Sequence, residues 1–113
     1  MRIVNKPWGH EKIWAETSNY VGKILVIESG HRLSKQFHNI KEETFLVIKG
    51  VLILEIGDGD NIVTFLMREG ESYHCPPGTI HRMSCGSEQA TEVAEVSTNH
   101  LDDIVRLEDD YQR

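Results

Sequence analysis

The stretch GHRLSKQFHNIKEETFLVIKG, residues Gly30–Gly50, carries three side chains that can bind a metal ion, and glycines frame it where the chain must turn. Gln36 and His38 stand two positions apart, so on a strand both side chains point to one face. Glu43 follows an expected bend at residues 39–41, which returns the chain along that face. The stretch therefore predicts two strands joined by a bend, with three ligand-type side chains on one surface.

A second stretch, GESYHCPPGTIHRM (Gly70–Met83), adds His81 after a Pro-x-Gly turn that can bring a distant strand alongside. Each of these residues alone would be explained as an ordinary surface or turn residue. Together they offer one amide, two imidazoles and one carboxylate, a set that leaves a divalent ion positively charged and suits a Lewis acid. The sequence therefore predicts a metal site at Gln36, His38, Glu43 and His81, with zinc expected and manganese, iron, cobalt or nickel as alternatives.

Short β-branched segments separated by turn signals run along most of the chain, and no window supports a long amphipathic helix. We expect strands at Lys23–Glu28, Thr44–Ile48, Val51–Ile56, Ile62–Met67, Ser72–Cys75, His81–Ser84 and Glu92–Ser97. A short helix is expected at Leu107–Gln112. The pattern predicts an all-β antiparallel sandwich or barrel, and the length of 113 residues predicts one domain, 1–113, around one core.

The charge balance, with 18 acidic against 12 basic residues and a net charge of −6, argues against nucleic acid or an anionic membrane as partner. A small anionic ligand remains compatible with it, because a few local cations can outweigh the net charge inside a pocket. The N-terminal MRIVNKPWGHEK holds no apolar stretch long enough for a signal peptide. We therefore expect a cytoplasmic protein in which Cys75 and Cys85 are reduced thiols.

The two glycine-framed blocks resemble the two motifs of the cupin superfamily. KPWG (6–9), RLSKQFH (32–38), GESYHCPPGTIHRM (70–83) and DDIVRLEDDYQR (102–113) further resemble the C-terminal cupin domain of type II mannose-6-phosphate isomerases, which is fused to a mannose-1-phosphate guanylyltransferase. The resemblance implies a double-stranded β-helix, or jelly-roll barrel, and metal-dependent interconversion of mannose 6-phosphate and fructose 6-phosphate. The chain departs from the family pattern at Lys35, Lys41, Phe45 and Gln112.

Aldose–ketose isomerisation needs a group that moves a proton between neighbouring carbons, and a phosphorylated substrate needs cationic donors. Lys35 and His31 are the candidate acid–base residues, while His74 is expected to face away from the site. Arg113 is the candidate phosphate ligand, because it matches the terminal arginine of the family's YGR motif. Lys23, beside the first motif strand, and Arg82, next to His81, are further candidates.

Two other functions fit the same residues. A sugar- or metabolite-binding cupin without catalysis, acting in polysaccharide biosynthesis, is favoured by the departures from the family pattern. A metal-dependent oxygenase on the same scaffold is disfavoured by Gln36 in the place of the first histidine. In either case we expect a homodimer that pairs through sheet edges, since pairing covers exposed strand backbone.

Overall fold

The structure is a computed structural model that describes residues 1–113 and contains no helix. Eleven strands follow one another along the chain: β1 (Arg2–Lys6), β2 (Gly9–Glu16), β3 (Tyr20–Ile27), β4 (Lys35–Phe37), β5 (Glu43–Lys49), β6 (Leu52–Ile56), β7 (Val63–Met67), β8 (Ser72–Cys75), β9 (His81–Cys85), β10 (Thr91–Thr98) and β11 (Val105–Glu108). The all-β fold expected from the sequence is confirmed, and each expected strand has a counterpart.

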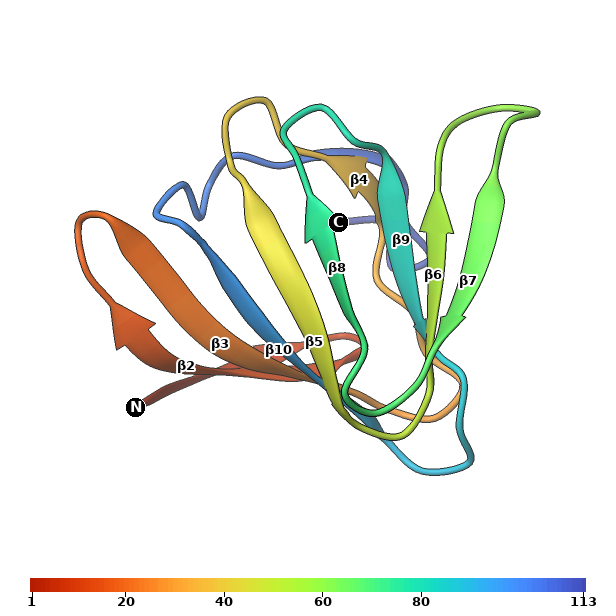
Figure 1. Cartoon of the computed structure of the whole chain (residues 1–113), viewed down its shortest axis with the longest axis horizontal. Coiled ribbons are helices and arrows are strands. Elements are labelled where there is room, and N and C mark those ends of the chain that lie inside the picture. The colour runs from red at the N-terminus through yellow and green to blue at the C-terminus, as the bar shows by residue number, and fades with distance from the viewer.

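The strands form two antiparallel sheets that face each other (Figure 1). One sheet has the order β1-β2-β3-β10-β5-β8, and the other has the order β11-β4-β9-β6-β7. The chain between β10 and β11 passes from the first sheet to the second, so residues 99–104 cross the open end of the barrel. This crossing brings the C-terminal segment next to the bend between β4 and β5.

The hydrophobic core fills the space between the sheets. Alternate residues of the strands point inward, because successive side chains of a strand face opposite ways. The buried cluster is Trp8, Leu25, Ile27, Leu33, Phe45, Val47, Leu52, Leu54, Met67, Cys75, Met83 and Val93. Gly9, directly after Trp8, is required by close packing, since a Cβ there would lie 1.9 Å from the Val26 carbonyl oxygen.

The helix expected at Leu107–Gln112 is wrong. Residues up to Glu108 belong to β11, which pairs with β4. Beyond it the Asp109 carboxylate accepts hydrogen bonds from the backbone N–H groups of Tyr111 and Arg113. A short carboxylate that binds nearby backbone N–H groups competes with helix formation, and the segment forms a turn instead.

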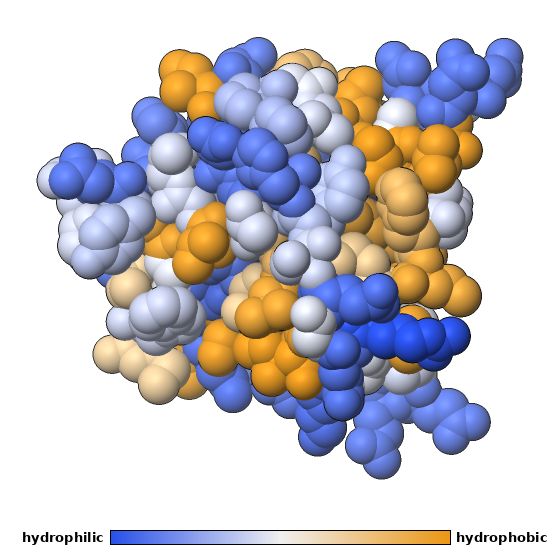
Figure 2. Space-filling view, in the orientation of Figure 1, coloured by the Kyte–Doolittle hydropathy of each residue, from blue (hydrophilic) through white to orange (hydrophobic).

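The outer surface carries exposed apolar side chains, which Figure 2 shows gathered at the right of the view, over β6 and β7. Val63, Phe65 and Leu66 of the edge strand β7 belong to this exposed set. No helix of the length and apolarity that crossing a bilayer would require is present. Both cysteines are free thiols, as expected.

Candidate metal centre

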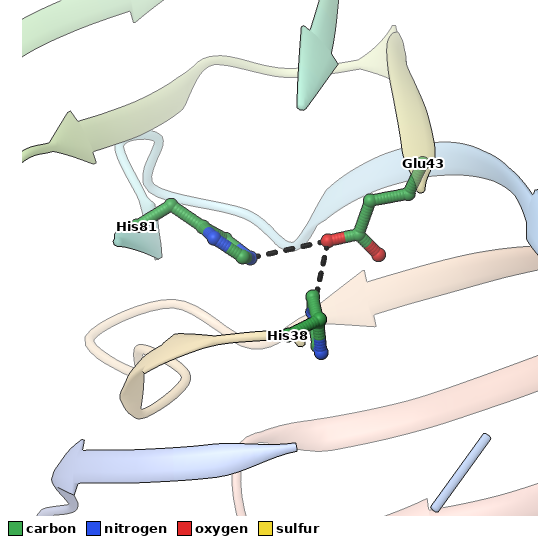
Figure 3. A group of neighbouring side chains, drawn as sticks. All are labelled: His38, Glu43 and His81. Atoms are coloured by element: carbon green, nitrogen blue, oxygen red, sulfur yellow. Dashed lines mark hydrogen bonds and ion pairs between the residues drawn. The ribbon is translucent and has the colours of Figure 1, made fainter. Parts of the chain in front are cut away.

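Three side chains from separate parts of the fold meet between the sheets: His38, Glu43 and His81 (Figure 3). Glu43 begins β5 and His81 begins β9, while His38 directly follows β4. The Nε2 atoms of His38 and His81 lie 3.1 Å and 3.2 Å from Oε2 of Glu43. One ligand atom from each residue lies within 4.8 Å of the others, and all three residues are buried.

Backbone carbonyls fix the orientation of both imidazoles. Nδ1 of His38 donates to the carbonyl of Asp103 at 2.6 Å, and Nδ1 of His81 donates to the carbonyl of Thr79 at 2.9 Å. Because a carbonyl can only accept, each Nδ1 carries a proton, and whenever the ring is neutral its Nε2 presents a lone pair toward Glu43. Hydrogen bonding of the distal nitrogen in this way is typical of metal-binding histidines.

The charges of the three groups are strongly shifted. Burial by itself raises the pKa of Glu43, but hydrogen bonds from His38 and His81 and the charge of Lys41 outweigh it and hold that pKa far below its ordinary value. Burial by itself lowers the pKa of His81, yet hydrogen bonds to Cys75 and Glu43 raise it to about 10. The site therefore favours positive charge between the imidazoles and the carboxylate.

A divalent metal ion fits this arrangement. If both rings were neutral, two Nε2 lone pairs would face a carboxylate oxygen, so the three atoms need a proton or a metal ion between them. Gln36 is buried in the same cavity wall and pairs with His81 across β4 and β9. His38, Glu43 and His81 would thus hold the ion, with the Gln36 amide beside them.

The candidate metal centre forms part of the wall of a cavity of about 270 Å³ between the sheets. Buried ion pairs continue along this wall from Glu43: Lys41 Nζ lies 3.1 Å from Glu43 Oε1 and 3.5 Å from Glu95 Oε2. Lys23 Nζ lies 3.5 Å from Glu95 Oε2 and 3.1 Å from Glu11 Oε2. Charges are kept buried only when paired, so this chain of charges marks a polar site rather than packing.

Further polar groups line the same cavity. The Oγ of Ser34, a fully buried residue, has no hydrogen-bond partner within the protein. Cationic side chains line it as well: Arg2, Lys6, Arg106 and Arg113. Arg113 is held in place by Asp109, with Nε 3.0 Å from the carboxylate, and lies over the Tyr111 ring. The lining suits a polar, negatively charged ligand.

The structure brings together some of the residues singled out from the sequence and not others. Besides the four metal candidates, the phosphate candidates Lys23 and Arg113 line the cavity. Arg82 lies outside it, because its guanidinium donates to the carbonyl of Leu33, in the segment before β4, and to the carbonyl of Glu108, at the end of β11.

The two acid–base candidates also lie outside the cavity lining. Lys35 forms an ion pair with Glu108 at 3.6 Å, while His31 is exposed and stacks on Tyr111. Lys35 precedes Gln36 on β4, so its side chain faces the other side of the sheet. His74 is exposed and contacts Glu42, as expected.

Sequence reasoning did not single out Glu95 or Asp103, and it named Lys41 only as a departure from the family pattern. On β10, the inward set Val93, Glu95 and Ser97 is no more apolar than the outward set, so alternation alone did not mark Glu95 as buried. Asp103 accepts hydrogen bonds from the N–H groups of residues 39, 40 and 41 at 3.0, 2.7 and 2.9 Å. These bonds fix the bend that carries Lys41, a link no local pattern reveals.

Several proteins of polysaccharide biosynthesis are similar to this chain in sequence. The alginate biosynthesis protein AlgA of Pseudomonas aeruginosa is 31% identical over 113 residues, covering 97% of this chain and 23% of that protein. The xanthan biosynthesis protein XanB of Xanthomonas campestris is 31% identical over 115 residues, covering 99% and 24%. A mannose-1-phosphate guanylyltransferase of Escherichia coli is 32% identical, covering 99% and 23%. The chain thus spans about a quarter of the length of these relatives.

Solved structures share the fold at lower identity. The capsular polysaccharide assembling protein CapF of Staphylococcus aureus superposes with a TM-score of 0.84 at 16% identity, over 95% of this chain and 31% of that one. Oxalate decarboxylase of Bacillus subtilis, described with Mn(II) centres, superposes with a TM-score of 0.80 at 16% identity, over 95% and 30%. These similarities show the double-stranded β-helix fold of the cupins.

The family model described as mannose-6-phosphate isomerase C-terminal matches residues 1–109, which include every strand and all three residues of the metal centre. This match covers nearly the whole chain and both sheets of the barrel, so it decides to which family the chain belongs. The chain belongs to the mannose-6-phosphate isomerase C-terminal family.

Proposed function

We propose that this chain is a metal-dependent sugar-phosphate isomerase that interconverts mannose 6-phosphate and fructose 6-phosphate. One observation carries the proposal: the His38–Glu43–His81 centre opens into a polar cavity lined by more cationic than acidic side chains. Family membership supports the same substrate class. A metal bound there would supply a positive charge for the oxygens of the substrate's carbonyl and neighbouring hydroxyl.

The chain's own residues supply the rest. Arg113, braced by Asp109, is the candidate donor for the phosphate, and the buried ammonium groups of Lys23 and Lys41 favour negative charge that develops on the sugar. The unpartnered Ser34 hydroxyl offers a hydrogen bond to a sugar hydroxyl. Lys23 and Lys41 are buried, and shielding from bulk solvent strengthens their interactions with a ligand.

A coupled assay tests the proposal. Purified protein is loaded with zinc, manganese, iron, cobalt or nickel, and fructose 6-phosphate formation from mannose 6-phosphate is followed. We expect turnover with at least one metal and its loss in His38→Ala and His81→Ala, whereas His74→Ala, an exposed histidine outside the cavity, should retain it. Absence of turnover with every metal would refute the isomerase function.

The second candidate is a sugar-phosphate-binding cupin without catalysis. It is favoured by the position of Lys35 and His31, the acid–base candidates of the sequence, outside the cavity. Calorimetry distinguishes the two: binding of mannose 6-phosphate without conversion would favour the binder. The protein is further proposed to form a homodimer, in which the exposed apolar side chains of β7 are a surface that association would cover. A monomer mass in light scattering would contradict this.

A further inference from the structure

Glu95 occupies an unusual position in the cavity wall. Its side chain, 5% exposed, lies between two ammonium groups, and Nζ of Lys23 and Nζ of Lys41 both contact the same oxygen, Oε2, at 3.5 Å. No hydrogen bond or ion pair within the protein engages the second oxygen, Oε1. The two lysines therefore anchor one oxygen of the carboxylate and leave the other available to a ligand.

The same network ties Glu95 to the metal centre. Lys41 Nζ also contacts Glu43 Oε1 at 3.1 Å, so a single ammonium group separates the carboxylate of Glu95 from a metal-binding carboxylate. Both Glu95 and the metal-binding side chains line the same cavity. A substrate whose oxygens face the metal centre would present its adjacent carbon atoms to this wall.

We propose that Glu95 is the catalytic carboxylate of the isomerisation, an inference that rests on the function proposed above. Its free oxygen takes the proton from C2 of the open-chain aldose; the C2–H electron pair forms the C1–C2 double bond, and the carbonyl electrons move to O1. Glu95, which exchanges this proton with water in part of the turnovers, then delivers a proton to C1, using the electron pair of that double bond, while the hydroxyl proton passes from O2 to O1. The sum is the ketose, with no co-reactant.

The other buried groups fit this role less well. Glu43 is engaged by both imidazoles and by Lys41. Lys41 Nζ lies between the carboxylates of Glu43 and Glu95, so its ammonium group is already engaged in two ion pairs. Glu11 contacts Lys23 alone and lacks the link through Lys41. Burial, together with repulsion from Glu43, raises the pKa of Glu95, which strengthens the carboxylate as a base.

Deuterium washout separates proton removal from overall turnover. Metal-loaded protein is incubated in water with mannose 6-phosphate deuterated at C2, and loss of the label is followed by NMR alongside formation of fructose 6-phosphate. Metal content and calorimetric binding of mannitol phosphate, which has no carbonyl, are measured for each variant. These two readouts show whether a variant keeps its centre and its ligand site independently of activity.

We expect Glu95→Gln to keep metal and mannitol phosphate binding while both label loss and ketose formation fall by about 10²–10⁴-fold. Glu95→Asp keeps the charge between the lysines but withdraws the carboxylate, and we expect a fall of about 10²-fold. If the glutamine variant does not fold, the aspartate variant decides. Glu42→Gln, an exposed carboxylate paired with His74, is the matched control and should behave as wild type.

The outcomes are distinct. If the wild type loses the label and both Glu95 variants lose it and form ketose at undiminished rates, the role of Glu95 is overturned and the isomerase function stays intact. An equal fall in Glu11→Gln would show that the loss reflects the buried charge network rather than a specific base, and it also overturns the proposal. A wild-type protein that neither isomerises nor loses label refutes the isomerase function, and the inference with it.

Discussion

Asp103 contacts no candidate ligand through its side chain, yet its replacement should weaken metal binding. Its carboxylate accepts three backbone N–H groups from the bend at residues 39–41, and its carbonyl accepts Nδ1 of His38 at 2.6 Å. In Asp103→Ala, all three N–H groups lose their acceptor at once, so the bend keeps only the hydrogen bond from His38 to the Asp103 carbonyl as its contact with that residue. Both the orientation of His38 and the approach of Lys41 depend on how the bend is attached to Asp103.

The expected magnitude follows from comparable partners of metal ligands, whose loss costs about 10–100-fold in metal affinity. Zinc affinity is measured by competition with a chromophoric chelator, and the protonated nitrogen of His38 is identified by ¹⁵N NMR. Asp60→Ala, which removes an exposed carboxylate from a turn on β6–β7, is the control and should leave both unchanged. Unchanged zinc affinity and an unchanged His38 tautomer in Asp103→Ala would refute the bracing role.

Three further predictions concern stability. Gly9→Ala places a Cβ 1.9 Å from a backbone carbonyl oxygen of β3 and should lower the free energy of unfolding by at least about 3 kcal/mol. Gly30→Ala has open space around it and should lower that free energy by about 1 kcal/mol. Urea titration of both variants compares the two losses. Phe45→Ala should cost about 3–5 kcal/mol and Phe65→Ala less than about 1.5 kcal/mol, and equal losses would contradict the assigned core. The backbone hydrogen bonds lower the pKa of Asp103 from 3.8 to about 2, so its stabilisation is complete above pH 3.8 and lost as the pH falls through about 2. Acid titration should therefore show the stability difference between wild type and Asp103→Asn shrinking over that range.

Local sequence patterns were enough to predict most of the strands. β3, β5, β6 and β7 are short β-branched or aromatic runs between turn signals, and such runs form strands in many contexts. The sequence analysis did not predict the N-terminal strands β1 and β2, because their residues mix charged and apolar types. The start of β2 also approaches β3 closely only because residue 9 is glycine. The prediction of a C-terminal helix was wrong because the Asp109 side chain accepts backbone N–H groups of the following residues. This is an effect of local geometry rather than of helix propensity.

The sequence by itself determined the all-β architecture and the residues that converge at His38, Glu43 and His81, because strand periodicity and turn glycines are local properties of the chain. Only the tertiary structure decided which cations face the cavity, that Lys35 and His31 stand outside it, and that Glu95 lies between two lysines near the metal centre. The physical reason is that β10, which carries Glu95, has two faces of similar polarity. Which of them is buried depends on the sheet that packs against it.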